Sequence, residues 1–149
     1  MEDVRNIAAW FLSKGSMTHK KLQKLCYYAQ AWHCALFNAP LFDGDIEAWV
    51  HGPVIPALYA AYASYGWAPI PQKSFDASSL SDSAREILDA VYETYGSFSG
   101  DQLEALTHSE APWIDARGDL KPWENCSTPI SFKDMQEYYR AQYAREQND

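Results

Sequence analysis

The strongest hydrophobic pattern in the chain lies between residues 19 and 37, where apolar side chains recur at steps of three and four. This spacing places them on one stripe of an α-helix, formed by Leu22, Leu25, Cys26, Ala29, Trp32, Leu36 and Phe37. Thr18 is a suitable N-cap, because its hydroxyl can accept a hydrogen bond from an amide of the first turn. We therefore predict a central helix over about residues 19–37, with other helices packed on either side of it.

The pattern changes to alternation after this helix. Within residues 46–51, the apolar side chains Ile46, Ala48 and Val50 alternate with the other three, which is typical of a strand. Asp43-Gly44 before the strand is a turn signal. These features predict one small β-hairpin over about residues 41–51, in which Glu47, Trp49 and His51 share a face.

Helical spacing recurs in most of the remaining chain. We predict helices at residues 4–14, 56–65 and 82–95, short helices near 99–106 and 112–117, and a final helix from residue 132. Ser99 and Gln102 have the spacing of a capping box, and Gly15 is placed for a left-handed C-terminal cap. The sequence thus predicts a mostly α-helical fold, a compact bundle of about six to seven helices in a single domain over residues 1–149.

The charge balance restricts the kind of partner. The chain has 12 Lys and Arg residues against 20 Asp and Glu residues, which gives a formal net charge of −8. Nucleic-acid binding depends on Lys and Arg contacts to phosphates, so we expect no nucleic-acid partner for this domain alone. An acidic surface attracts basic proteins instead.

Other features bear on location and cofactors. No run of about 18 apolar residues is present, so we expect no membrane association. The start of the chain, Met1-Glu2-Asp3, lacks the basic segment that begins a signal peptide. The three cysteines show no metal-ligand spacing. We therefore predict a cytoplasmic protein with neither metal nor cofactor.

Aromatic residues gather around the predicted hairpin and the helix that follows it. This cluster consists of Trp49, Tyr59, Tyr62, Tyr65 and Trp67. Helical spacing makes core packing the expected role for most of them. Their number exceeds the needs of one core, however, and an exposed aromatic patch marks an interface.

Four polar residues raise the alternative of an enzyme. Glu, His and Arg side chains such as Glu47, His51, His108 and Arg117 can build a general acid–base site. They can equally form hydrogen bonds to buried backbone where His51-Gly52-Pro53 bends the chain. We favour the second interpretation and predict a protein without enzymatic activity, because no nucleophile elbow, phosphate loop or dinucleotide fingerprint is present.

Two separate blocks of sequence resemble a known family. The first comprises residues 21–32 and 46–54, and the second contains Leu106-Thr107-His108, Pro112-Trp113 and Ala116-Arg117. Their order and spacing are similar to those of the Panacea domain family, also called SocA-like antitoxins or phage-associated GepA-like proteins. The matched positions that we single out as motif or structural residues are Gln23, Lys24, Tyr28, Gln30, Trp32, Glu47, Gly52, Pro53, His108 and Arg117.

The resemblance implies an antitoxin that neutralises a cognate toxin, encoded nearby, through direct protein–protein contact. One family member instead delivers its toxin to a cellular protease, and this adaptor role is an alternative to blocking. An enzyme built on Glu47, His51, His108 and Arg117 is the less favoured third hypothesis. The acidic charge suits a basic toxin, and a homo-oligomer stays open. We expect the toxin to dock around the hairpin, on Trp49, His51, Tyr59, Tyr62 and Trp113.

Overall fold

One long helix runs through the middle of the computed structural model, which describes residues 1–148. This helix, α2 (His19–Phe37), begins at Thr18, whose side chain accepts from the Lys21 amide at 3.2 Å. It ends at Asn38, which adopts a left-handed conformation with φ of 54°. Buried residues occur in every turn of α2 up to Ala35. The predicted central helix over residues 19–37 is therefore confirmed.

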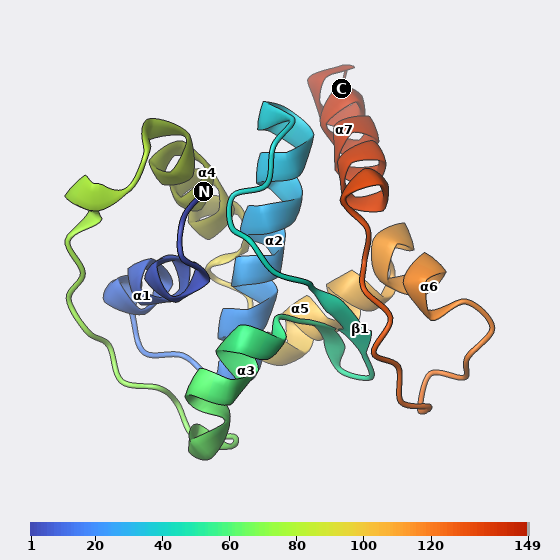
Figure 1. The fold of residues 1–149 in the computed structure, drawn as a ribbon, viewed down its shortest axis with the longest axis horizontal. Helices are drawn as coiled ribbons and strands as arrows, with labels where there is room; N and C mark the ends of the chain where they lie inside the picture. Colours follow the sequence, from blue (N-terminus) through green and yellow to red (C-terminus); the bar gives the residue numbers. More distant parts are fainter. Residues whose placement is uncertain (149) are drawn as a thin grey trace.

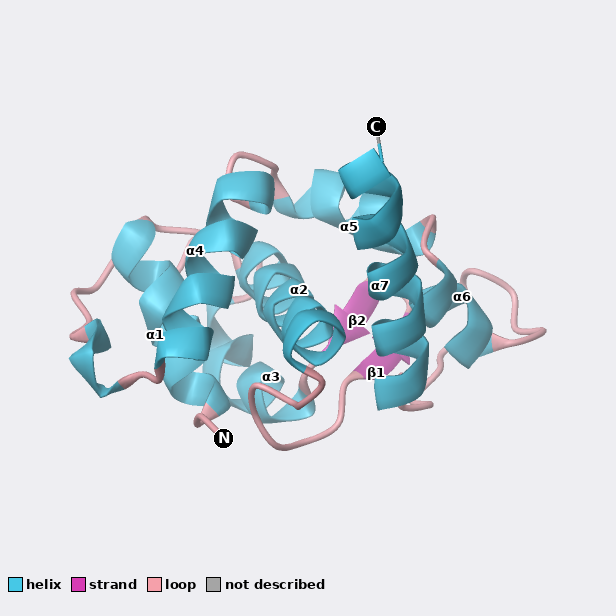
Figure 2. Ribbon diagram, turned by 90° about the horizontal axis from the view of Figure 1, so that it is seen from above, coloured by secondary structure: helices cyan, strands magenta, loops and turns pink. Residues whose placement is uncertain are grey.

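The other helices surround α2 (Figures 1 and 2). In chain order they are α1 (Val4–Lys14), α3 (Pro56–Tyr62), α4 (Asp82–Tyr95), α5 (Gly100–His108), α6 (Ala111–Arg117) and α7 (Phe132–Asn148), with 3₁₀ turns η1 (Ala63–Tyr65) and η2 (Ala77–Ser79). Seen along α2 in Figure 2, α1 and α4 lie on one side and α6 and α7 on the other. The mostly helical fold class is confirmed. None of the helices described is both long and apolar enough to span a bilayer.

Helix ends follow the predicted caps with one exception. Ser99 and Gln102 form both hydrogen bonds of the capping box at the start of α5. Gly15, by contrast, has an extended backbone with φ of 168°, so the predicted left-handed cap is wrong. The chain leaves α1 extended because Met17 pairs with Ile70 in an isolated antiparallel bridge.

The β-hairpin lies later in the chain than its predicted bounds. Strand β1 (Glu47–Trp49) pairs antiparallel with β2 (Gly52–Val54), and Ala48 faces Pro53. The predicted bounds of 41–51 are therefore wrong, since residues 50–51 form the turn and residues 41–42 are not a strand. His51 does not lie on the same strand face as Glu47 and Trp49. The sequence misleads here because Gly52 and Pro53 are unusual strand residues.

A buried hydrogen-bond network joins the central helix to the end of the chain. Tyr28 of α2 and Tyr139 of α7 both donate to Glu110 Oε1, at 2.7 and 2.9 Å. The Tyr28 ring also stacks on Tyr95 with ring centroids 4.0 Å apart, and the Trp32 indole donates to the Tyr95 hydroxyl at 2.9 Å. Two of the motif positions, Tyr28 and Trp32, thus hold the core together.

Candidate functional site

Two glutamines of α2 bind the backbone on either side of the hairpin. Gln23 accepts from the Ile55 amide at 2.8 Å and donates to the Ile55 carbonyl at 3.2 Å. Gln30 accepts from the Leu41 amide at 2.7 Å and donates to the Phe42 carbonyl at 2.8 Å. Both side chains are buried, and each replaces a missing strand partner. These motif residues therefore fix the entry and the exit of the hairpin segment.

Lys24 of α2 approaches the hairpin closely. Its side chain is 1% exposed, and its ammonium donates to the Pro53 carbonyl at 3.3 Å. Gly52 lies directly against it with φ of +108°, and a Cβ at this position would be 2.6 Å from Lys24 Cε and 3.0 Å from Thr107 Oγ1. Burial lowers the pKa of Lys24 to about 7. A side chain at position 52 would therefore strain the backbone and require Lys24 to shift.

Residues of α6 bind the other side of the hairpin. The Arg117 guanidinium donates to the Ala48 carbonyl at 2.9 Å, and the Trp113 indole donates to the Trp49 carbonyl at 2.8 Å. Arg117 also donates to the Lys121 carbonyl at 2.9 Å, which ties down the loop between α6 and α7. The second family-like block therefore positions both the hairpin and this loop.

His108, the last residue of α5, also supports the hairpin. Its ring stacks on Trp113 with centroids 4.0 Å apart and planes 18° apart, and it meets the backbone of Val50. Burial lowers the pKa of His108 and so favours the neutral ring. Its Nε2 is a buried nitrogen with no hydrogen-bond partner within residues 1–148. A neutral, stacked imidazole fits a packing role beneath the hairpin.

The four side chains considered for acid–base chemistry bond to separate partners. Arg117 binds backbone carbonyls, as the favoured interpretation of the sequence expected. Glu47 accepts from the Trp49 indole at 2.8 Å, and His51 pairs with Glu104 at 3.0 Å. Of the four, only His51 lines the cavity described next. Within residues 1–148, no three His, Cys, Asp or Glu side chains are grouped to hold a metal ion.

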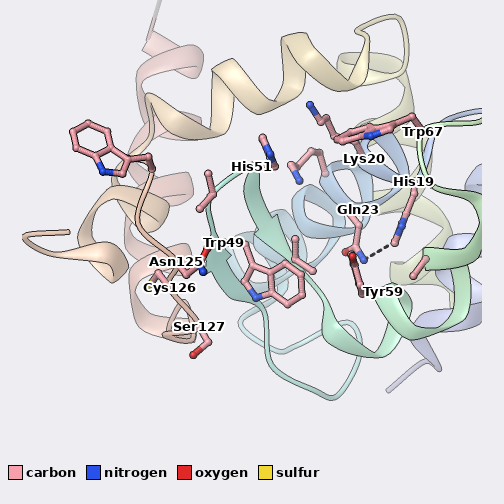
Figure 3. A pocket seen from close by; sticks show the side chains of 16 residues that line it. His19, Lys20, Gln23, Trp49, His51, Tyr59, Trp67, Asn125, Cys126 and Ser127 are labelled. Atoms are coloured by element: carbon pink, nitrogen blue, oxygen red, sulfur yellow. Dashed lines mark hydrogen bonds between the residues drawn. The ribbon is translucent and has the colours of Figure 1, made fainter. Parts of the chain in front are cut away.

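A groove of about 830 Å³ opens beside the hairpin (Figure 3). Its floor is formed by the first turns of α2 together with the hairpin, and its walls by α3 with residues 63–67 and by residues 123–127 of the α6–α7 loop. Figure 3 shows Trp67 beside Lys20, away from Asn125 and Ser127 on the opposite wall.

The predicted partner-binding residues are divided between the groove and the interior. Trp49, His51 and Tyr59 line the groove, and the rings of Trp49 and Tyr59 lie 5.0 Å apart. Tyr62 is half-buried against the core. Trp113 is buried with 7% exposure, so it supports the Trp49 backbone from inside and offers little surface to a partner.

Two exposed tryptophans belong to the groove although we did not predict them as site residues. Trp67 and Trp123 line opposite walls, and each is 73% exposed. Both lie in loops beside Gly or Pro, where no helical or strand periodicity assigns them to a core. A large apolar side chain in such a polar loop is the sequence signal that could have identified them.

Comparisons with known proteins agree with the two sequence blocks. Residues 22–114 match the family described as "Antitoxin SocA-like, Panacea domain". The chain is also similar to "Antitoxin SocA" of Caulobacter vibrioides, with 30% identity over 128 residues that cover 74% of this chain and 68% of the relative. No solved structure matches the chain.

Proposed function

Because the chain belongs to the SocA-like antitoxin family with the Panacea domain, we propose that it neutralises a cognate protein toxin by direct binding. The observation that carries this proposal is the groove beside the hairpin, where two exposed tryptophans flank Trp49 and Tyr59. Tryptophan and tyrosine are the residues most often found as energetic anchors of protein interfaces. Exposing two indoles to water is otherwise unfavourable, which points to a partner that covers them.

The surroundings of the groove favour tight binding. Hydrogen bonds from α2 and α6 hold the hairpin backbone on both sides. A surface that is already ordered loses little conformational entropy when a partner docks. Because the hairpin is held in place, the surface formed by Trp49, His51 and Tyr59 is largely ordered before a partner binds. Tyr62 and Trp113 lie behind this surface and support it.

Charge adds a contribution at long range. The net charge of −8 favours encounter with a basic toxin and makes the association rate sensitive to salt. We further propose that the toxin is encoded beside this chain, on a phage or prophage, and that both proteins act in the cytoplasm without an enzymatic step by the antitoxin.

The test is co-expression with the small gene adjacent to this one, with growth and recovery of the complex as readouts. Binding predicts that rescue requires antitoxin at least equimolar to toxin, whereas an enzyme would rescue at lower levels. Trp67→Ala and Trp123→Ala should each weaken the complex by about 2 kcal/mol or more, about 30-fold in Kd.

Tyr143→Ala is the matched control, because this aromatic residue of α7 is also exposed, at 43%, but does not line the groove. It should bind and rescue like the parent. Failure of the wild-type chain to bind or rescue would contradict the antitoxin assignment, and full activity of both tryptophan variants would contradict the proposed surface.

A further inference from the structure

The chemistry of the groove differs from that of the molecule as a whole. Among the residues that line it are Lys20, Lys24, His19 and His51, whereas none of its described lining residues is Asp or Glu. The 149 residues nevertheless include 20 acidic residues against 12 basic ones. The acidic excess is therefore located elsewhere.

One group of acidic side chains outside the groove lies on α4. Asp82, Glu86, Asp89 and Glu93 are all exposed and follow helical spacing along one face of this helix. Figure 2 shows α4 and the hairpin on opposite sides of α2. A partner that enters the groove thus meets a different face of the molecule from the acidic face of α4.

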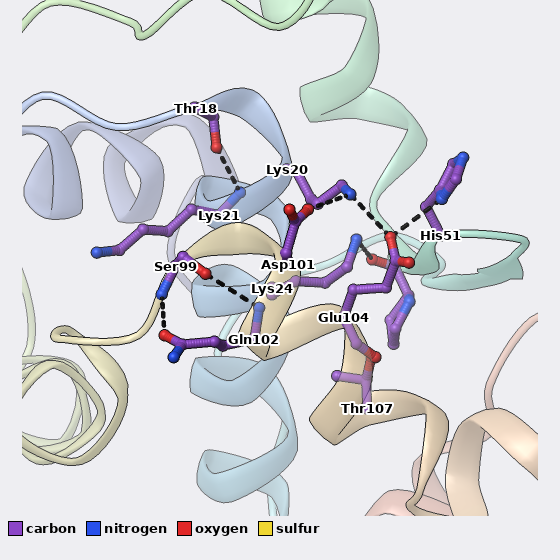
Figure 4. Close-up of polar contacts among 11 residues, drawn as sticks. Thr18, Lys20, Lys21, Lys24, His51, Ser99, Asp101, Gln102, Glu104 and Thr107 are labelled. Carbon is purple, nitrogen blue, oxygen red and sulfur yellow. Dashed lines mark hydrogen bonds and ion pairs between the residues drawn. The ribbon is translucent and has the colours of Figure 1, made fainter.

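The two lysines are held at the groove by different contacts (Figure 4). The Lys20 ammonium lies 2.9 Å from both Asp101 and Glu104 of α5, and 5.2 Å above the Trp67 ring. These carboxylates fix Lys20 without lining the groove themselves. Lys24 makes no ion pair in the part of the chain that the structure describes, and its single acceptor is the Pro53 carbonyl at 3.3 Å. An ammonium with one long hydrogen bond retains donors for an incoming anion.

We propose that the groove receives an acidic segment of the toxin, with a carboxylate directed toward Lys20 and Lys24 and neighbouring apolar side chains packed against Trp67 and Trp123. This inference rests on the proposed antitoxin function and specifies the chemistry of its contact surface. The overall acidity accelerates encounter with a basic partner, while the groove selects the segment that docks. An anion between the lysines gains charge-assisted hydrogen bonds, which are stronger than neutral ones.

The experiment compares two charge reversals in the wild-type toxin complex. Lys20→Glu should raise the Kd by about tenfold or more, since it places a like charge beside the incoming carboxylate. Lys133→Glu changes the net charge equally but lies exposed on α7 outside the groove, so it should alter the Kd much less. Equal effects of the two variants, or tighter binding by Lys20→Glu, would overturn the acidic-segment proposal. In that case binding and rescue by the wild-type chain would still support the antitoxin function.

A second measurement does not rely on Lys20, which also has structural ion pairs. Lys24 is faced by His19 and Lys20 of α2 and by Glu104 and His108 of α5. A bound carboxylate favours the charged form of Lys24, so complex formation should take up a proton and weaken as the pH rises through about 7. Lys24→Met should remove most of this pH dependence in isothermal titration. A folded Lys24→Met protein with the parent's proton uptake would refute the role of Lys24.

Discussion

Lys24 and Gly52 meet where α2 passes beneath the hairpin, and their contact shows how single residues shape the site. The lysine is buried against Gly52, where an added Cβ would lie 2.6 Å from Lys24 Cε. Other matched residues have a similar role, because Gln23 binds the backbone of Ile55 just after the hairpin and Arg117 binds the Ala48 carbonyl. The matched residues thus hold the hairpin in place, and the aromatic residues of the groove form the proposed contact surface.

Substitution of Gly52 tests this contact. Gly52→Ala should lower the free energy of unfolding through backbone strain, about 1–3 kcal/mol, and through the clash with Lys24, about another 1–3 kcal/mol. Gly44→Ala is a matched control, since Gly44 has φ of +110° with nothing within 4 Å of a Cβ, so only the strain applies. Urea titration of both variants measures the difference. Equal losses would show that Lys24 does not restrict position 52.

At the scale of whole elements, one carboxylate joins three helices. Glu110 immediately precedes α6 and accepts from Tyr28 of α2 and Tyr139 of α7. Burial raises the pKa of Glu110 above its ordinary value of 4.5, and the two tyrosine hydrogen bonds oppose this only in part. The helices that carry the hairpin supports are therefore joined to α7 by a carboxyl group whose pKa is raised by burial.

This raised pKa predicts a pH-dependent stability. The folded state binds the Glu110 proton more tightly than the unfolded state, so the group's contribution to stability is full below pH 4.5 and declines as the pH rises through the folded pKa. The amide side chain of Glu110→Gln does not titrate in this pH range. Denaturant titrations from acid to neutral pH should therefore show the variant gaining stability relative to the parent as the pH rises. A constant difference would mean that Glu110 does not titrate differently in the two states.

The elements also show what sequence can predict. Helices α2, α4 and α5 followed from periodicity and caps, because those signals are local. The presence of a hairpin also followed from alternation, but its bounds did not, since the second strand Gly52-Pro53-Val54 is held through contacts distant in sequence. Trp67 was placed in the aromatic cluster but not among the partner-binding residues, and Trp123 was missed. Both belong to loops that only the tertiary fold brings to one groove.

In the molecule as a whole, the acidic face of α4 and the proposed contact surface lie apart. Four exposed acidic residues lie along α4, whereas lysines and exposed tryptophans line the groove across α2. The net charge acts at long range and changes mainly the association rate, whereas the residues of the groove contact the partner directly. The account depends on the groove being the surface that meets the toxin.

Hydrogen exchange of the backbone amides, measured on the protein alone and in its complex with the toxin, tests this claim most directly. The account predicts slower exchange in the complex at the hairpin turn, at residues 63–68 and at residues 123–127, because a docked partner excludes water from the groove. It also predicts unchanged exchange along the exposed face of α4. Protection confined to α4 or α7, with the groove segments exchanging as in the free protein, would contradict it.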